Sequence, residues 1–237
     1  MTTTLRVLMS GGFAGAYDRL LPEFERASGI EVTTGSGASQ GSGPHTIAAQ
    51  LAHGVAADVV IMSREGLAEL VAAHRIVAGT AVDLASVPLG VAVRAGAPKP
   101  DVSTVDAFKQ VVLDAKIVAV PGSTSGIWLK TELFPRLGLA DKINVVMTAR
   151  GSDASGMVAK GEADLAVMPV SEILAAAGVD HAGAIPAEIQ MVQVFAAAIV
   201  AGSTASDAAK RLIAFLASPQ AAATIARSGM VPVTTAR

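Results

Sequence analysis

The chain has 237 residues, of which 51% are hydrophobic and only 3% aromatic, and its formal net charge is −2. With few rings and no excess of positive charge, the sequence excludes a nucleic-acid-binding surface made of basic and stacking side chains. It contains no cysteine, which excludes thiol catalysis, disulfides and cysteine metal sites. The length is sufficient for two domains of roughly 100 residues each.

The first residues favour a strand over a leader. Met1–Thr4 runs directly into Leu5–Met9, which has strand length and carries the charge of Arg6. A secretory leader opens instead with a basic stretch and an apolar stretch of about 7–15 residues. No apolar run in the chain reaches the roughly 18 residues that span a bilayer. We therefore expect a cytoplasmic protein with no membrane segment, or a periplasmic one if a leader has been removed.

Short β-rich runs alternate with helical segments in the first part of the chain, which is typical of a parallel sheet covered by helices. The expected elements are strand Leu5–Met9, a helix with Phe13, Tyr17, Leu20, Leu21 and Phe24 on one face that ends near Gly29, strand Ile30–Thr34, loop Ser36–Gly43, helix His45–His53, strand Asp58–Met62 and helix Arg64–Ala73. Pro44 is expected at the first helical position, where its missing N–H costs nothing.

A second unit begins near Leu84, because Pro88 and the Gly/Pro-rich loop at residues 96–100 interrupt the earlier rhythm. Its expected elements are helix Ser103–Asp114, strand Ile117–Val120, helix Ser125–Leu137, strand Ile143–Met147, helix Asp153–Lys160, strand Asp164–Met168 and helix Val170–Ala176. The apolar strand Met191–Val200 then returns the chain to the first unit, where helices Ser206–Leu216 and Gln220–Arg227 follow.

The sequence thus predicts an α/β fold of two lobes. Lobe 1 comprises residues 1–83 and 197–237, and lobe 2 comprises residues 84–196. The chain crosses between the lobes twice, and two such crossings form a hinge. A hinge beside an interdomain cleft allows a protein to close around a ligand.

Four segments share one design, in which a strand ends, a loop rich in Gly and Ser follows, and a helix begins. They are residues 10–12, 35–43, 122–126 and 150–156. At this edge of an α/β sheet, helix N-termini offer unpaired N–H groups and a partial positive charge to an anion. The alternative for each segment is a simple helix cap, because Ser and Thr cap helices in many proteins. The predicted anion-binding residues are Ser10, Gly11, Gly12, Ser36, Ser39, Ser123, Thr124, Ser125 and Ser152.

Basic side chains also lie at or just after strand-to-helix junctions. They are His45, Arg64, Lys130 and Arg150. Arginine binds a carboxylate through two parallel hydrogen bonds and lysine supplies a point charge, so the set favours a carboxylate ligand. The alternative for each is an ordinary surface charge or, for His45, a bond to its own backbone. The other histidines are His53, His74 and His181, and we interpret them as surface or loop residues. Their spacing does not match a metal-ligand motif, so we expect no metal and no cofactor.

Several short motifs spread over the chain carry a family resemblance. They are Phe24–Gly29 before a strand, Gly54–Val60, Gly161–Asp164 with the later pair Ser171-Glu172, and Ala214–Ala221 with Gly229–Pro232. With these motifs the sequence resembles, nearly end to end, the periplasmic-binding-protein type II fold and within it the molybdate-binding-protein-like family of solute-binding proteins. The resemblance implies a bilobal cleft for a small solute, and it specifies the fold more closely than the ligand.

Two positions depart from the molybdate binders of this family. Those proteins usually place a serine pair at the start of the second helix, where this chain has Pro44 and His45. They often carry a tyrosine after the Gly-Glu-Ala-Asp motif, where this chain has Pro169. Both departures disfavour a tetrahedral metal oxyanion as the ligand.

Relatives with this fold include aconitate isomerase, which interconverts cis- and trans-aconitate, so the resemblance implies two functions. In a cytoplasmic isomerase of that type, His45 would move the proton while Arg64, Lys130 and Arg150 would hold carboxylates. The alternative is an ABC-transport-type solute-binding protein for molybdate- or tungstate-like oxyanions or organic anions, with an ABC permease as its partner. A small anion is the expected ligand in both cases.

Overall fold

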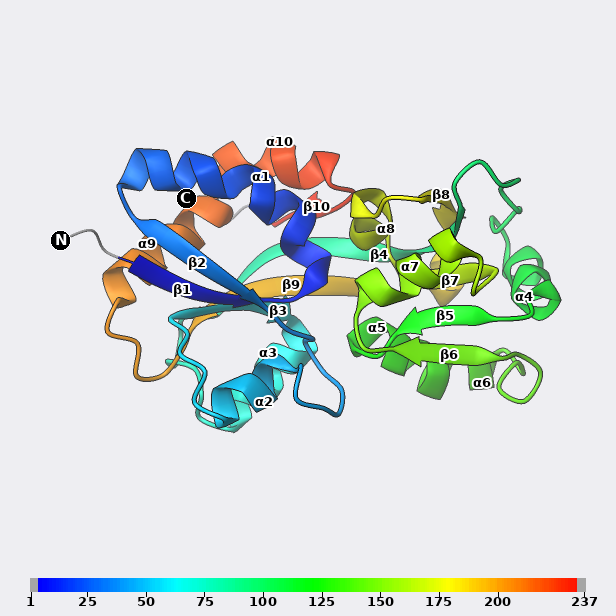
Figure 1. Ribbon diagram of the computed structural model, residues 1–237, viewed down its shortest axis with the longest axis horizontal. Helices are drawn as coiled ribbons and strands as arrows, with labels where there is room; N and C mark the ends of the chain where they lie inside the picture. Colours follow the sequence, from blue (N-terminus) through cyan, green and yellow to red (C-terminus); the bar gives the residue numbers. More distant parts are fainter. Residues whose placement is uncertain (1–3, 234–237) are drawn as a thin grey trace. The chain divides into compact units, whose positions relative to one another are not determined.

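The computed structural model describes residues 4–233 and divides the chain into two compact units. Unit 1 contains the residues up to Ser86 together with those from Val194 onward, and unit 2 is Val87–Gln193. Strands β4 (Val82–Arg94) and β9 (Val192–Ile199) carry the chain from one unit to the other. Both units contain strands covered by helices, so the predicted α/β class is confirmed (Figure 1).

In unit 1 the parallel strands share one edge. Strands β2 (Glu31–Ser36) and β3 (Val59–Ser63) pair in parallel with β1 (Thr4–Met9), so that Met9 lies opposite Ser36 on one side and Ile61 on the other. Strand β9 runs antiparallel to β3. The remaining elements are α1 (Gly11–Ser28), α2 (Ile47–Ala52), α3 (Arg64–Ala72), α9 (Ser206–Leu216), α10 (Pro219–Arg227) and β10 (Val231–Pro232), which pairs with β4.

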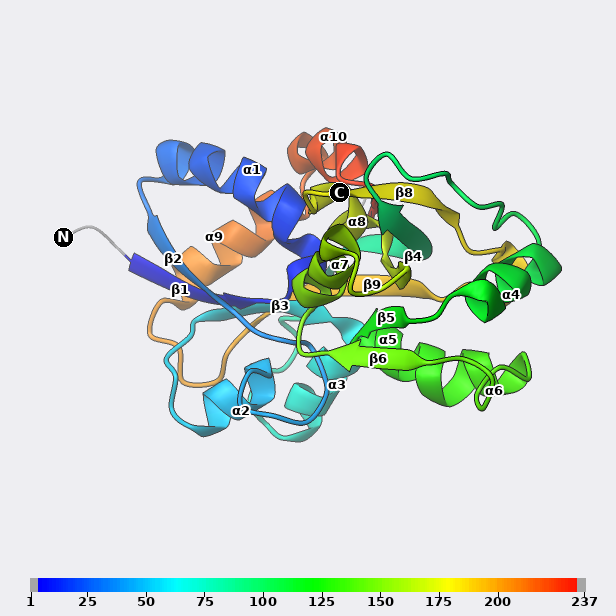
Figure 2. The ribbon, with the colours of Figure 1, turned by 45° about the vertical axis from the view of Figure 1, so that its right-hand side comes forward.

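Helices cover both faces of the unit 1 sheet. Helices α1 and α10 lie over one face, and α2 and α3 lie over the other (Figures 1 and 2). Val60 and Met62 of β3 pack against Leu51 of α2 and Leu67 of α3. Since side chains alternate along a strand, the residues between them face α1. Helix α1 buries one stripe at helical spacing: Phe13, Tyr17, Leu20 and Phe24.

In unit 2 the strands β6 (Val145–Thr148) and β7 (Leu165–Pro169) flank β5 (Val118–Pro121) in parallel. Strand β4 pairs antiparallel with β7 and with β8 (Val179–Ala184). The other elements are α4 (Val105–Asp114), α5 (Thr124–Trp128), the π-helix η1 (Leu129–Leu133), α6 (Phe134–Arg136), α7 (Gly151–Lys160), α8 (Val170–Ala175) and the 3-10 turn η2 (Ala187–Ile189).

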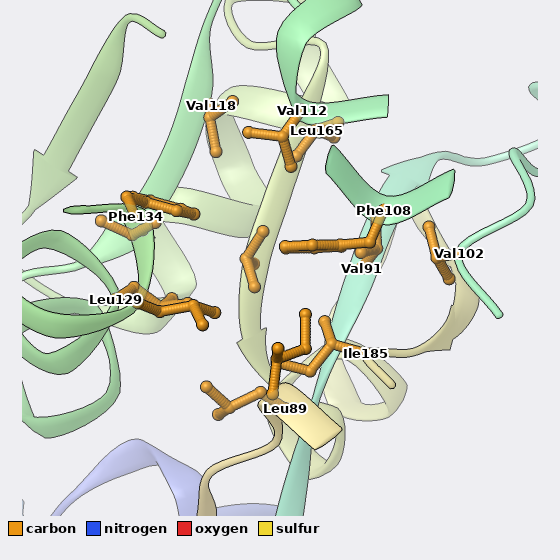
Figure 3. Packing of buried hydrophobic residues seen from close by; sticks show 14 of the residues in the cluster. Leu89, Val91, Val102, Phe108, Val112, Val118, Leu129, Phe134, Leu165 and Ile185 are labelled. Carbon is orange, nitrogen blue, oxygen red and sulfur yellow. The ribbon is translucent and has the colours of Figure 1, made fainter. Parts of the chain in front are cut away.

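The two faces of the unit 2 sheet differ in side-chain size. Val118 packs on one face with Phe108 and Phe134 from the covering helices (Figure 3). On the other face the strands present small residues such as Ala119 and Ala166, against which Ala154 of α7 packs. Small side chains on both partners let α7 lie close to the strands. This close packing fixes the first turn of α7 at the end of β6.

Strand β8 was not predicted. Its sequence contains Asp180, Gly183 and alanines, which have low strand propensity. It forms because β4 offers an unpaired edge, and the pairing shifts register between Val91 and Ala92. Other predicted boundaries were displaced by a few residues. Helix α7, for instance, begins at Gly151 rather than Asp153, so that Arg150 is its N-cap.

The predicted helix His45–His53 is wrong at its start. Helix α2 begins at Ile47 and Thr46 is its N-cap, because the Thr46 hydroxyl accepts a hydrogen bond from the Ala49 N–H at 3.1 Å. Pro44 and His45 lie in the turn before the helix. Proline favours a turn as well as a first helical position. Because the Thr46 hydroxyl caps the helix, Pro44 lies in the turn.

Replacing Thr46 with alanine should lower the free energy of unfolding by about 1 kcal/mol, because one helix N–H loses its acceptor. Urea unfolding followed by circular dichroism measures this loss. Ser42→Ala, an exposed change in the preceding loop, should leave the urea midpoint unchanged. Equal midpoints for the Thr46 variant and the wild type would contradict the assigned cap.

Candidate functional site

The carboxyl ends of the three parallel strands of unit 1 are joined by hydrogen bonds. The N–H of Ser10 donates to the carbonyl of Ile61 at 2.9 Å, and the N–H of Gly37 donates to the last carbonyl of β1 at 2.9 Å. The N–H of Ser63 donates to the Ser39 hydroxyl at 2.9 Å. The predicted residues Ser10, Ser36 and Ser39 therefore lie on one edge of unit 1.

Ser10 is in the state expected of a ligand-binding residue. It is the N-cap of α1 and only 5% exposed, yet its hydroxyl makes no capping bond. Within residues 4–233 the Ser10 Oγ atom has no hydrogen-bond partner. A buried polar atom without a partner costs about 1–3 kcal/mol. An anion at the start of α1 would supply the missing acceptor, and the 18-residue helix would favour its charge.

The two glycines after Ser10 differ. Gly11 is exposed on the first turn of α1. Gly12 is buried, and a Cβ atom at this position would overlap the ring of Phe195 in β9. Gly12 therefore lets the start of the helix pack closely on the sheet, a role that its place in a Gly-rich loop did not reveal.

Ser39 and Ser63 form a relay that holds the loop after β2 against the end of β3. Ser39 is 3% exposed and accepts the bond from Ser63. The Ser63 hydroxyl in turn caps α3 by accepting from the Gly66 N–H at 3.2 Å. Ser63 was missed at the sequence level, although a Ser between an apolar strand and a helix is the usual signal of such a cap. Ser36 is exposed, and its carbonyl accepts from the Gln50 side chain at 3.0 Å.

The predicted basic residues of unit 1 flank this relay of buried serines, but their side chains are exposed. His45 is exposed in the turn before α2, and its carbonyl accepts from the Ala38 N–H at 2.9 Å. Arg64 is the first residue of α3, and its Nε atom donates to Asp83 Oδ1 at 3.1 Å. The Arg64 guanidinium is thus already paired with a carboxylate of its own unit. A ligand carboxylate would have to share it or exchange with Asp83.

Unit 2 repeats the arrangement at the ends of β5 and β6. The N–H of Gly122 donates to the carbonyl of Thr148 at 2.6 Å, and the Thr148 hydroxyl donates to the carbonyl of Arg150 at 2.7 Å. Thr124 and Ser125 are buried in the first turn of α5, and Ser123 is its N-cap. The second group of predicted hydroxyls therefore also lies on one edge.

The remaining predicted residues of unit 2 are exposed. Arg150 is the N-cap of α7, and its backbone N–H donates to Asp153 Oδ2 at 3.0 Å. Ser152 lies in the first turn of α7. Lys130 lies in the π-helix η1, beyond the first turn of the helix rather than at its junction with the strand. Of the two charged residues, Arg150 lies nearer to the end of a strand than Lys130 does.

Glu172 is the residue at this edge that sequence reasoning missed as a functional group. It is the third residue of α8, directly after β7, and its carboxyl oxygen Oε2 occupies the space that a Cβ atom at Gly151 would fill. Burial raises the pKa of Glu172 to about 7. The Ser171-Glu172 pair served only as a family motif, since nothing local to it predicts a contact with α7.

His181 is not the surface or loop residue that was expected. It lies in β8 and is partly buried, and its Nε2 atom has no hydrogen-bond partner among the described residues. Burial lowers the pKa of His181, while a hydrogen bond to Gly183 partly opposes this effect. The ring lies against Gly90 and Val170, beneath the start of α8.

Neither a metal centre nor a membrane segment is evident in the described part of the chain. Residues 4–233 contain no group of three or more His, Asp or Glu side chains placed to hold a metal ion. No helix within the same range is long and apolar enough to cross a membrane.

Comparison with known proteins places the chain in a family. The family described as bacterial extracellular solute-binding protein matches residues 5–231. An aconitate isomerase from a Pseudomonas species is 40% identical over 234 residues, which is 98% of this chain and 88% of that protein. The chain therefore belongs to the solute-binding protein family that the sequence motifs indicated.

Solved structures support the same fold at lower identity. The periplasmic molybdate-binding protein of Azotobacter vinelandii has a TM-score of 0.78 at 22% identity, with 96% of this chain and 98% of that one covered. The sulfate-binding protein of Mycobacterium tuberculosis has a TM-score of 0.76 at 22% identity, with 98% and 87% covered. The fold is thus that of the periplasmic binding proteins, as predicted.

Proposed function

We propose that this protein binds a small polycarboxylate and interconverts the cis and trans isomers of aconitate by a proton shift. The observation that carries the proposal is the 40% identity to an aconitate isomerase over 98% of the chain. The two edges described above provide chemistry that suits such a ligand. Each presents buried hydroxyls beside a helix start, and Arg150 adds a positive charge on the second edge.

The roles of the individual residues are part of the proposal. The hydroxyls of Ser10, Ser39 and Ser125 donate hydrogen bonds to ligand carboxylates, and Arg64 and Arg150 balance their charge. Other predicted ligand contacts are Gly11, Gly12, Ser36, Ser123, Thr124, Lys130 and Ser152. His45 is the sequence-derived candidate for moving the proton. A shared site in a cleft between two lobes, and the cytoplasmic location, stay predictions from the sequence.

A transport function is the second candidate, because the family description is that of an extracellular solute-binding protein. Under it the same two edges bind an oxyanion or an organic anion without chemical change, and an ABC permease is the partner. Buried neutral hydroxyls bind a tetrahedral oxyanion as well as a carboxylate, so binding alone does not distinguish the two candidate functions. Conversion of the ligand distinguishes them.

Incubating the purified protein with trans-aconitate should yield cis-aconitate at a rate proportional to protein concentration. Chromatographic separation of the two isomers measures the conversion, and heat-denatured protein is the control. A parallel thermal-shift series with aconitate, citrate, molybdate and tungstate ranks the ligands, since a ligand of the native state stabilises it by mass action. Stabilisation by molybdate or tungstate alone, with no conversion, would support the transport function instead.

A further inference from the structure

The proposed isomerisation needs one group that takes a proton and gives it back. A C–H bond of the ligand's CH2 group breaks, and its electron pair becomes the new C=C bond. The electron pair of the old C=C bond forms a C–H bond at the far allylic carbon. One proton moves and nothing is oxidised or reduced. Such a group must hold the proton near neutral pH and lie where carboxylates bind.

Glu172 lies at the edge of unit 2 where the predicted hydroxyls gather. Strands β5, β6 and β7 are parallel, so the residues that follow them share one side of the sheet. Ser123 follows β5, Arg150 follows β6, and Glu172 lies in the first turn after β7. The Glu172 carboxyl is placed against Gly151, the first residue of α7. Glu172 is therefore a proton-carrying group in the first turn of α8 and beside the start of α7.

The surroundings of Glu172 leave its proton available. The elements that contact α8 carry these charged or titratable groups: Asp153, Lys160 and the N-cap Arg150 on α7, and Asp180 and His181 on β8. Within the described residues none of them forms an ion pair or hydrogen bond with the Glu172 carboxyl. Burial alone raises its pKa to about 7, so that both the acid and the carboxylate are populated near neutral pH.

The other proton carriers fit less well. The His45 side chain is exposed to water in the turn before α2. The Nε2 atom of His181 is buried against Val170 and Gly90, below the first residue of α8 and away from solvent.

We propose that Glu172 is the acid–base residue of the isomerisation, a step that rests on the proposed function. Its carboxylate removes the proton from the ligand's CH2 group, and the resulting carboxylic acid returns that proton to the far allylic carbon. Arg150 and the hydroxyls at the start of α5 hold the ligand's carboxylates while the negative charge is delocalised. Gly151 positions Glu172, because only glycine leaves room for the carboxyl at the first turn of α7.

The test is the Glu172→Gln variant, which keeps the shape of the side chain and removes the acid–base function. Turnover of trans-aconitate should fall by about 10²–10⁴-fold with a small change in KM. In the wild type, kcat/KM should rise with pH through an apparent pKa near 7, and this limb should vanish in the residual activity of the variant. Glu172→Asp should recover part of the rate. Glu162→Gln, an exposed change after α7, should match the wild type.

Stability provides a readout that does not depend on activity. The folded pKa of Glu172 lies above the ordinary glutamate value of 4.5, so the folded state holds its proton more tightly than the unfolded chain. The melting temperature of the wild type should therefore fall relative to that of Glu172→Gln as pH rises from about 5 to 8. Gly151→Ala should displace the Glu172 carboxyl. The pH-dependent change in melting temperature should then become smaller, and turnover should fall as well.

The possible outcomes separate the two proposals. Full activity in Glu172→Gln, with the wild type active, overturns the role of Glu172 and leaves the isomerase function standing. Loss of activity in His45→Ala with full activity in Glu172→Gln assigns the proton to His45. A wild type that binds trans-aconitate but never converts it overturns the isomerase function, and the role of Glu172 with it.

Discussion

Replacing Gly126 with alanine should destabilise unit 2 by on the order of 3 kcal/mol or more and abolish the anion binding that we propose at the start of α5. A Cβ atom at Gly126 would overlap the carbonyl oxygen of Pro121, the last residue of β5. That oxygen belongs to the backbone and cannot rotate away, so either the strand end or the helix start must move. The hydroxyls of Thr124 and Ser125 would move with the helix.

The measurement is direct because Trp128, the sole tryptophan of the chain, lies two residues after Gly126. Its fluorescence during urea unfolding follows unit 2. Gly156→Ala is the matched control, since nothing lies within 4 Å of a Cβ placed at that position in helix α7. The control should be as stable as the wild type or gain up to about 1 kcal/mol from the higher helix propensity of alanine. Similar urea midpoints for both variants would refute the close approach of α5 to β5.

Replacing Asp58 with asparagine should destabilise unit 1 by about 2–4 kcal/mol. Asp58 is fully buried directly before β3, where its Oδ2 atom accepts from the Arg6 N–H at 2.9 Å and from Arg6 Nε at 3.3 Å. Its Oδ1 accepts from the Ser203 hydroxyl at 2.8 Å. All three bonds require an acceptor. An amide would turn its NH2 group toward one set of donors and would leave the Arg6 guanidinium without a counter-charge.

The pH dependence provides a second check. Burial alone would raise the pKa of Asp58, but hydrogen bonds from Arg6 and Ser203 and the charge of Arg6 outweigh it and hold the pKa below its usual value. The unfolded chain therefore binds the proton more tightly, and the stabilising effect is present above about pH 4 and lost as pH falls further. The stability difference between wild type and Asp58→Asn should shrink over that range. Asp141→Asn, an exposed change in a turn, should show no such trend.

The role proposed for Glu172 changes the interpretation of the family motifs. In the sequence, Ser171-Glu172 and Gly161–Asp164 indicate the fold, and His45 is the candidate proton carrier. A carboxyl is a poor proton carrier at neutral pH when it is solvated, because its pKa is then near 4. The packing of α8 against α7 supplies the burial that makes Glu172 suitable. Such a candidate is visible only once the neighbours of each acid are known.

Part of the site followed from local patterns. Ser10, Ser39 and Ser123 lie in the loops that follow strands β1, β2 and β5, and the parallel register of the strands brings the serines of each unit to one edge. The pairing of Arg64 with Asp83, 19 residues away, has no local signal. The start of α2 at Ile47, with Thr46 as its N-cap, had a competing signal in Pro44, and only the hydrogen bond from the Ala49 N–H to the Thr46 hydroxyl resolved it.

The sequence by itself determined the α/β class, most of the strands and helices, and the family, because hydrophobic spacing and short motifs are local properties of the chain. The tertiary structure alone decided the pairing of β8 with β4, the lack of a hydrogen-bond partner for the Ser10 hydroxyl among residues 4–233, and the partial burial of Glu172 against Gly151. These facts depend on which segments become neighbours after folding. The electrostatics of a carboxyl and the satisfaction of a hydroxyl are set by those neighbours and by the exclusion of water.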